Sequence, residues 1–243
     1  KRDKKINKMI IPFKPEELFE LNDNLQPKKV GDVIIVNNVF KNYDKIVEVL
    51  NNMSVENWKL TEGTRNFIDY YDCRPIFKNH FPTILTDKRF STLFEMFEKL
   101  YDDIDMESLY TNYEFIFNYF KNNIKDLPST KQHRPHMDEY YNVIFYLDNI
   151  NNGGTVIYHS EDINGNVVEN GGPLEGNELL TDISHLRIKQ YIEGTPNSLV
   201  IVDGSQLHGA WIDDYNKYLN DWRISLVHFI YPSEPKGTND DIV

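Results

Sequence analysis

The stretch KQHRPHMDEYYNVIFYLDN, from Lys131 to Asn149, places two histidines and an aspartate directly ahead of a run rich in β-branched and aromatic residues. That run has the composition of a buried strand. Because residues i and i+2 of an extended chain point to the same side, His136 and Asp138 can face one point. One imidazole and one carboxylate are two of the three ligands in a metal site of two histidines and one carboxylate. The stretch therefore predicts either part of a metal site or a polar loop that precedes a strand.

The same pattern occurs a second time, as His159-x-Glu161. With 7 His and 38 Asp plus Glu in the chain, the pattern alone has little specificity. His159 follows the strand-like segment TVIY, and Glu161 begins a long polar segment with several glycines. We expect His159 at a strand end, on the surface or in a lid over residues 159–193.

A third ligand would have to come from another strand, and His208 is the candidate. It lies in NSLVIVDGSQLHGAW, Asn197 to Trp211, after an apolar strand and a turn and beside small residues that leave room for a ligand. Taken alone, His208 is more simply interpreted as a hydrogen-bonded turn histidine.

Arg223 and Ser225 occupy positions i and i+2 at the start of RISLVHFIYP. An arginine buried in a barrel needs an anionic partner, and the planar guanidinium fits a carboxylate. Arg223 therefore predicts either a bound carboxylate or a structural ion pair.

The chain changes character near residue 110. Five short β-prone runs follow, separated by Asn, Gly, Asp and Pro: 110–120, 140–149, 153–159, 197–204 and 223–232. Helices are expected ahead of them, at Pro15–Phe19, along the apolar stripe of Ile46, Val47, Val49 and Leu50, and over Ser91–Tyr101. We expect an α+β protein with an arm over 1–28 and one domain over 29–243. Within that domain, helical support covers about 29–105, the strand-rich core about 110–232 and a tail 233–243.

The composition excludes or disfavours several classes of partner and cross-link. The net charge of −12 disfavours nucleic acid, and a single cysteine, Cys73, excludes an intrachain disulfide and a cysteine-based zinc cluster. The sequence contains no apolar run long enough to span a membrane. We therefore expect a soluble, cytoplasmic protein without a membrane partner.

The order His136-x-Asp138, His208, Arg223-x-Ser225 resembles that of the Fe(II)/2-oxoglutarate-dependent oxygenases, in particular the prolyl-4-hydroxylase-like branch. The resemblance covers about Tyr113 to Pro232. NGGTVIY, Asn152 to Tyr158, is similar to the Gly-Gly-Thr segment of that branch, and Val33 to Leu50 is similar to an opening strand–turn–helix found in some bacterial and phage members. The branch itself often has Lys where this chain has Arg223, which weakens the case for proline as substrate.

The resemblance implies a double-stranded β-helix (jelly-roll) core with flanking N-terminal helices. It implies Fe(II) bound by His136, Asp138 and His208. It also implies 2-oxoglutarate bound through Arg223 and Ser225, with Tyr119 as a further contact. Related halogenases replace the carboxylate ligand with a small residue, so Asp138 favours hydroxylation.

The implied function is a dioxygenase that uses O₂ to hydroxylate an amino acid, a peptidyl residue or a small metabolite, with release of succinate and CO₂. Substrate contacts are expected in residues 159–193 and at Arg134, Tyr140, Tyr141, Trp211 and Arg65. Two alternatives stay open. One is a cupin-like metal enzyme without 2-oxoglutarate, although the tighter cluster of a third histidine and a glutamate is missing. The other is a catalytically silent binding module on the same fold.

Overall fold

The structure is a computed structural model. It describes residues 15–52, 59–61, 70–72, 110–118, 135–138, 141–161, 164–168, 186–218 and 223–231. The helix expected over Ser91–Tyr101 lies outside these ranges.

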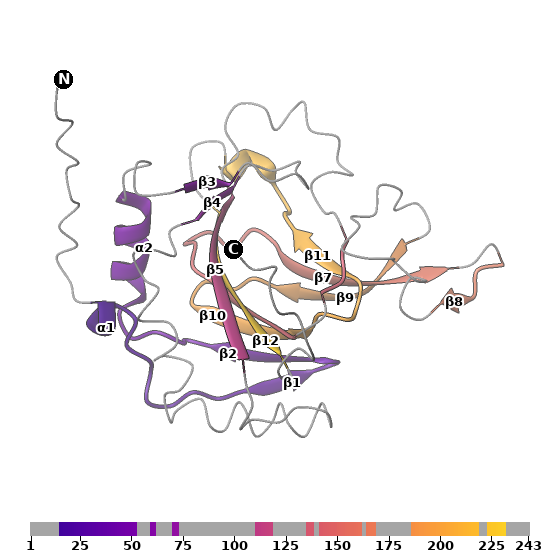
Figure 1. The fold of residues 1–243 in the computed structure, drawn as a ribbon, viewed down its shortest axis with the longest axis horizontal. Coiled ribbons are helices and arrows are strands. Elements are labelled where there is room, and N and C mark those ends of the chain that lie inside the picture. Colours follow the sequence, from indigo (N-terminus) through magenta and orange to yellow (C-terminus); the bar gives the residue numbers. More distant parts are fainter. Residues whose placement is uncertain are drawn as a thin grey trace, which may run out of the picture.

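Two antiparallel sheets form most of the described chain (Figure 1). The larger sheet has the order β1-β2-β10-β6-β12-β5-β4-β3. Its strands are β1 Lys28–Val30, β2 Val33–Asn37, β10 Ser198–Asp203, β6 Tyr141–Tyr146, β12 Arg223–Tyr231, β5 Tyr110–Asn118, β4 Tyr70–Asp72 and β3 Lys59–Thr61. Strands distant in sequence are therefore neighbours, as in a jelly-roll.

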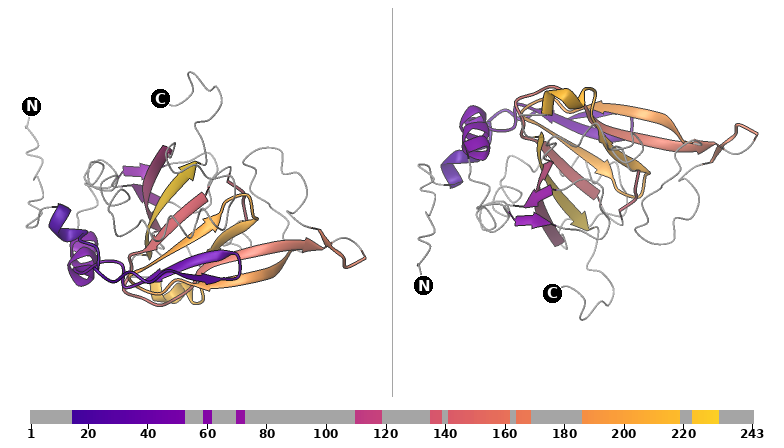
Figure 2. Two further views of the ribbon diagram at one scale, coloured as in Figure 1. Left: turned by 90° about the horizontal axis from the view of Figure 1, so that it is seen from below. Right: turned by 90° about the horizontal axis from the view of Figure 1, so that it is seen from above.

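The smaller sheet is built around β7, Gly154–Glu161. It pairs with β11 (His208–Trp211), with β8 (Val167–Val168) and with β9 (Leu186–Glu193). The β7–β9 register shifts between Ile157 and Tyr158. Figure 2 shows β8 projecting at the end of the molecule opposite to the helices.

The two sheets enclose an apolar core between them. Alternate residues of β6, β10 and β12 supply Ile144, Tyr146, Val200, Val202 and Val227, and the smaller sheet adds Ile157 and Ile192. Val33 completes this cluster from β2. Side chains alternate between the two faces of a strand, so the residues in register with these eight strand positions also face the interior. The other faces of β6 and β10 are buried as well.

The Gly153-Gly154 pair is required by the close approach of β7 to its neighbours. A Cβ on Gly154 would lie 2.0 Å from the carbonyl oxygen of Ile192, and one on Gly153, which has a φ of +120°, would lie 2.0 Å from that of Trp211. Only glycine tolerates both the contact and the positive φ. The Gly-Gly-Thr segment thus has a structural role in joining β7, β9 and β11.

The helices lie at one side of the sheets (Figure 1). Helix α1 spans Pro15–Leu18 and α2 spans Tyr43–Asn52, with the expected stripe of Ile46, Val47, Val49 and Leu50 buried. A 3-10 helix spans Tyr215–Tyr218. No helix in the described ranges is both long and apolar enough to cross a membrane.

The expected arm over residues 1–28 is described from Pro15 onward. Leu18, Phe19 and Leu21 are each only 1% exposed, and Phe19 packs edge-on against Phe40 with ring centroids 5.6 Å apart. The apolar side chains of this part of the chain are therefore buried, and Phe19 packs against a residue well beyond α1.

Candidate metal centre

Backbone hydrogen bonds bring the two candidate metal-binding segments together. The amide of His136 donates to the carbonyl of His208 (2.9 Å), and the amide of His208 donates back to His136 (3.0 Å). The amide of Asp138 donates to the carbonyl of Gly204 (2.7 Å), in the turn ahead of β11. The segment 135–138 is thereby tied to the β10–β11 connection, although some 70 residues separate them in the sequence.

The side chains of His136, Asp138 and His208 converge, as strand alternation predicts. Their ligand atoms all lie within 4.8 Å of one another. Asp138 Oδ2 is 3.7 Å from His136 Nε2 and 3.4 Å from His208 Nε2. Met137, between His136 and Asp138, packs instead against the apolar cluster of Val156, Tyr158, Leu186 and Leu207.

The protonation states suit a divalent metal ion. Burial alone would raise the pKa of Asp138, but its contacts with His208, His136 and Asn142 outweigh that effect and lower the pKa to about 2. The carboxylate is therefore ionised at neutral pH. His208 Nδ1 lies 2.8 Å from the carbonyl of Gln206, which makes Nδ1 the protonated nitrogen and leaves the Nε2 lone pair to a metal. Two imidazoles and one carboxylate fit Fe(II).

Asn142, on β6, is a fourth polar residue at this centre. Its Nδ2 lies 2.6 Å from Asp138 Oδ2 and 3.0 Å from His208 Nε2. The side chain is buried, and its Oδ1 has no hydrogen-bond partner among the described residues.

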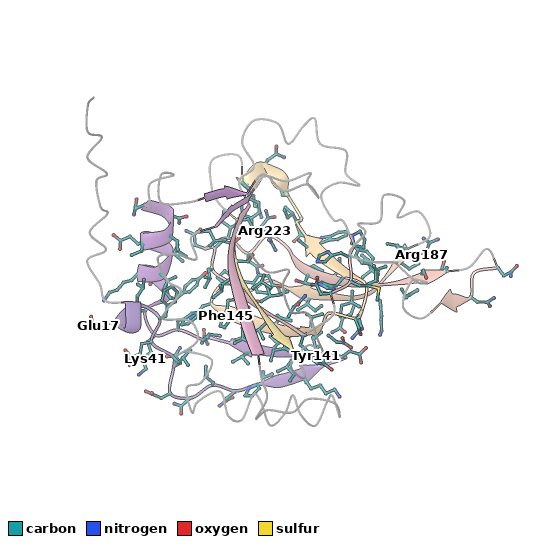
Figure 3. The ribbon with its side chains drawn as sticks, in the orientation of Figure 1. Glu17, Lys41, Tyr141, Phe145, Arg187 and Arg223 are labelled. Carbon is teal, nitrogen blue, oxygen red and sulfur yellow. The ribbon has the colours of Figure 1, made fainter. Side chains whose placement is uncertain are left out.

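Arg223 lies on the same interior face as this centre, toward the other end of the barrel. In β6, Asn142, Ile144 and Tyr146 share the interior face, and Tyr146 is in register with Ser225 of β12. Four residues of strand, roughly 13 Å, separate Asn142 from Tyr146. In Figure 3, Arg223 and Tyr141, the first residue of β6, appear at opposite ends of the sheets.

The surroundings of Arg223 are polar and enclosed. Its Nη2 donates to the carbonyl of Gly154 at 3.4 Å, a weak hydrogen bond. Tyr146 and Ser225 are buried beside it, and the Tyr146 hydroxyl lies 2.6 Å from Thr155 Oγ1. Burial raises the pKa of Tyr146 to about 12, so its hydroxyl stays protonated at neutral pH and can donate. A Cβ on Gly194 would lie 2.8 Å from the Tyr146 ring, which shows how closely the backbone packs here.

Asp148 supplies negative charge near Arg223. Burial raises the pKa of Asp148 to about 6, while Arg223 and a hydrogen bond from Tyr218 act in the opposite direction. The Tyr218 hydroxyl donates to Asp148 Oδ2 at 2.8 Å. Among the described residues, however, no carboxylate lies within 4.0 Å of the Arg223 guanidinium. Arg223 is thus buried beside a weakly acidic carboxyl group rather than in a close ion pair.

The second His-x-acid pattern forms an ion-pair cluster, and within the described ranges it has no third candidate ligand for a metal. Glu161 pairs with Arg187 of β9 (3.2 Å) and lies 3.9 Å from His159 Nε2. His159 is two residues from Ile157, which is in register with His208, so it shares the interior face of β7 beyond the metal centre. Figure 3 shows Arg187 well away from Arg223.

The other residues predicted to contact substrate or cofactor are only partly described. Trp211 is in register with Gly154, on the face of the smaller sheet opposite to His208. Its ring packs against Tyr191, and its Nε1 donates to Asp213. Tyr141 is buried at the start of β6. The remaining candidates, Tyr119, Arg134, Tyr140 and Arg65, lie outside the described residues.

Sequence reasoning overlooked Asn142 and Tyr146. The signal was present in the strand alternation that linked His136 to Asp138, because continuing it along β6 selects residues 142, 144 and 146. The family resemblance instead implies a tyrosine on the strand before the metal motif, Tyr119, which lies outside the described residues.

No family model and no curated protein matches the chain. Several solved structures are similar to it. HygX from Streptomyces hygroscopicus with nickel and 2-oxoglutarate bound is 12% identical over 84% of each chain, with a TM-score of 0.49. EvdO2 from Micromonospora carbonacea var. aurantiaca complexed with 2-oxoglutarate is 12% identical over 89% of this chain and 97% of its own, with a TM-score of 0.40.

The epimerase SnoN in complex with Fe3+, alpha ketoglutarate and nogalamycin RO is 9% identical. The match covers 82% of this chain and 78% of SnoN, with a TM-score of 0.49. With TM-scores below 0.5, these similarities contribute nothing to the assignment of function, which depends on the geometry of the site.

Proposed function

We propose that this chain is an Fe(II)/2-oxoglutarate-dependent oxygenase. The observation that supports the proposal is a pair of features on one interior face: three convergent ligand atoms from His136, Asp138 and His208, and the buried guanidinium of Arg223. A metal centre alone would serve many reactions. A buried cation on the same face adds a binding point for an acid.

In this proposal, His136 Nε2, Asp138 Oδ2 and His208 Nε2 hold the iron. The hydrogen bond of His208 Nδ1 to Gln206 fixes the imidazole tautomer, and the backbone ties of residues 136 and 138 fix the position of the other two ligands. His136 is the most exposed of the three, with 36% of its side chain accessible against 4% for His208. A substrate would therefore approach from the side of His136.

Arg223, Ser225 and Tyr146 would bind the distal carboxylate of 2-oxoglutarate. The guanidinium offers a planar pair of donors, and the two hydroxyl groups offer further hydrogen bonds. The apolar side chains of Ile144, Ile157 and Val227 line the interior between the two ends and exclude water from it. When bound, iron and 2-oxoglutarate supply O₂-dependent oxidation of a substrate C–H bond, coupled to decarboxylation to succinate and CO₂.

The expected reaction is hydroxylation of an amino acid, a peptidyl residue or a small metabolite. The retained carboxylate of Asp138 supports hydroxylation over halogenation. Membership of the prolyl-4-hydroxylase-like branch stays a prediction that depends on the Gly-Gly-Thr segment, which the structure also explains by strand packing alone.

Asp148 favours a second candidate, a metal enzyme that does not use 2-oxoglutarate. Its charge lowers the electrostatic cost of burying Arg223, so the arginine has a structural explanation within the chain. The two candidates share the metal site and differ in whether an external diacid binds.

Anaerobic addition of Fe(II) and then 2-oxoglutarate to the purified protein tests the proposal. We expect a visible metal-to-ligand charge-transfer band in the wild type, its loss in His136→Ala, and its retention in His159→Ala, a matched change in the other His-x-acid pattern. Iron binding without the band would favour the second candidate. A band that is unchanged in His136→Ala would contradict the assignment of the ligands.

A further inference from the structure

The side-chain amide of Asn142 contacts the candidate metal centre through its nitrogen, Nδ2, whereas its oxygen, Oδ1, makes no hydrogen bond among the described residues. Nδ2 lies within hydrogen-bond distance of both Asp138 Oδ2 and His208 Nε2, the same two atoms that would bind the metal. Oδ1 is buried without a partner among the described residues. The 2.6 Å contact with Asp138 Oδ2 identifies the nitrogen end of the amide, because a carboxylate oxygen only accepts hydrogen bonds.

An orphaned amide oxygen makes Asn142 costly as a packing residue. Burying a carbonyl oxygen without a hydrogen bond opposes folding, and an apolar side chain of similar size would avoid the penalty. The neighbours on the same face of β6, Ile144 and Tyr146, are part of the apolar cluster. The amide is therefore better explained by what its nitrogen holds than by the packing of the barrel.

We propose that Asn142 is a positioning residue that pre-organises the metal site in the metal-free protein. Its two N–H groups hold Asp138 Oδ2 and His208 Nε2 3.4 Å apart, ready for a shared ion. With His208 Nε2 bound to a metal, Asn142 would lose its bond to that nitrogen and keep its bond to the Asp138 carboxylate. That remaining bond prevents rotation of the Asp138 carboxylate, whose other nearby groups are the two imidazoles.

Asn142 has two opposite effects on the affinity for a divalent metal, and the larger effect decides whether the residue strengthens or weakens binding. Asn142 competes with the metal for His208 Nε2, which weakens metal binding. It also orients an ionised ligand, and a hydrogen bond to a charged group is stronger than one between neutral groups. The second effect dominates, so loss of the amide weakens the binding of a divalent metal. Outer-shell partners of this kind are worth roughly 10- to 100-fold in affinity.

The test compares Asn142→Leu with Asn152→Leu. Both asparagines are 2% exposed. Asn152 differs in that both ends of its amide are used: Nδ2 donates to the carbonyl of Asp214 (2.7 Å), and Oδ1 accepts from the amide of Asp214 (2.9 Å). Each purified, metal-free variant is titrated with Co(II), followed by its visible absorbance, and unfolded thermally without metal. No 2-oxoglutarate or turnover is needed.

We expect Asn142→Leu to bind Co(II) about 10- to 100-fold more weakly while its metal-free melting temperature is unchanged or raised. Asn152→Leu should show the opposite pattern, a lower melting temperature and wild-type affinity. If Asn142→Leu does not fold, Asn142→Ala replaces it in the same measurements, because the smaller side chain cannot clash with its neighbours.

The inference depends on the metal site of the proposed function. The outcomes of the test distinguish a failure of that metal site from a failure of the positioning role of Asn142. Wild-type protein that binds no Co(II) refutes the metal site itself. Wild-type binding with equal or tighter binding by Asn142→Leu or Asn142→Ala leaves the metal site intact and refutes the positioning role. A melting temperature that falls in Asn142→Leu, without a change in affinity, would show that the amide is a structural element of the barrel.

Discussion

Replacement of Arg223 by methionine separates a cofactor-binding arginine from a structural one. Methionine keeps most of the length of the side chain and removes the charge and the donors. If 2-oxoglutarate binds as proposed, its distal carboxylate is left buried without its cation. Removing one partner of a buried ion pair costs about 3–5 kcal/mol, which corresponds to a roughly 10²- to 10⁴-fold weaker affinity.

The fold should tolerate this change because of Asp148. Its pKa is already raised to about 6 by burial, against the opposing influence of Arg223. Without the arginine the pKa rises further, so Asp148 becomes neutral near pH 7 and keeps its hydrogen bond with Tyr218 instead of remaining as an unpaired charge. Metal affinity should be unchanged, since Arg223 and the ligands lie at different ends of the interior face.

The assay is a titration of 2-oxoglutarate into the anaerobic Fe(II) protein, followed by the charge-transfer band, with Co(II) affinity as the control. Arg223→Lys keeps the charge and loses the planar fork. We expect it to be intermediate, weaker than wild type by the loss of one charge-assisted hydrogen bond, about 1.5–3 kcal/mol. Wild-type affinity for 2-oxoglutarate in a folded Arg223→Met variant would refute the assignment and leave Arg223 as a structural residue.

Three further predictions concern the same region. Because the pKa of Asp148 is raised by burial from 3.8 to about 6, the folded protein holds this proton more tightly than the unfolded chain does. The stability from this group is therefore complete below pH 3.8 and falls by about 3 kcal/mol as the pH rises through 6. Urea unfolding of Asp148→Asn across this range should lack that decline, and an identical decline would contradict the assignment. Tyr146→Phe should lower the free energy of unfolding by about 1 kcal/mol, because the hydrogen bond to Thr155 is lost. It should also weaken the binding of 2-oxoglutarate to the anaerobic Fe(II) protein. Unchanged binding would show that Tyr146 does not contact 2-oxoglutarate. Gly154→Ala should lower the free energy of unfolding by about 3 kcal/mol or more, because the new methyl group clashes with the Ile192 carbonyl. The control is Gly165→Ala: Gly165 has a φ of +79° but open space around it, so this change should lower the free energy of unfolding by only about 1 kcal/mol. Equal melting temperatures of the two variants would show that β7 can move.

The strand pattern could be predicted from sequence because each run carries its own local signal. The runs that hold β6, β7, β10 and β12 are apolar, β-branched and bounded by turn residues, and the structure places strands in all of them. His208 is a candidate partner for His136 because it follows an apolar strand and a turn, and the resemblance to a known family implies the same ligand set. Nothing local in the sequence shows that two segments some 70 residues apart exchange backbone hydrogen bonds.

Asn142 and Asp148 show where sequence reasoning stopped. Both are polar residues at or next to an apolar strand, where a side chain is easily taken as a solvent-exposed position. Their roles depend on partners from elsewhere in the chain, His208 and Tyr218. The alternation of β6 gives the face of Asn142 but not its contacts. Trp211, three residues after His208, lies on the opposite face of β11 because side chains alternate along a strand. Its contact with a substrate stays a prediction.

The pairing of β7 with β11 sets the distance between the candidate metal centre and Arg223. His208 is opposite Ile157, and Gly154, three residues back along β7, receives the hydrogen bond from Arg223. The separation between the metal centre and the buried guanidinium is thus counted in residues of one strand. Inserting or deleting a single residue between Gly154 and Ile157 would not merely lengthen or shorten that separation. It would reverse the alternation of β7 between these two positions, so that His208 and Arg223 would no longer be held toward the same interior face.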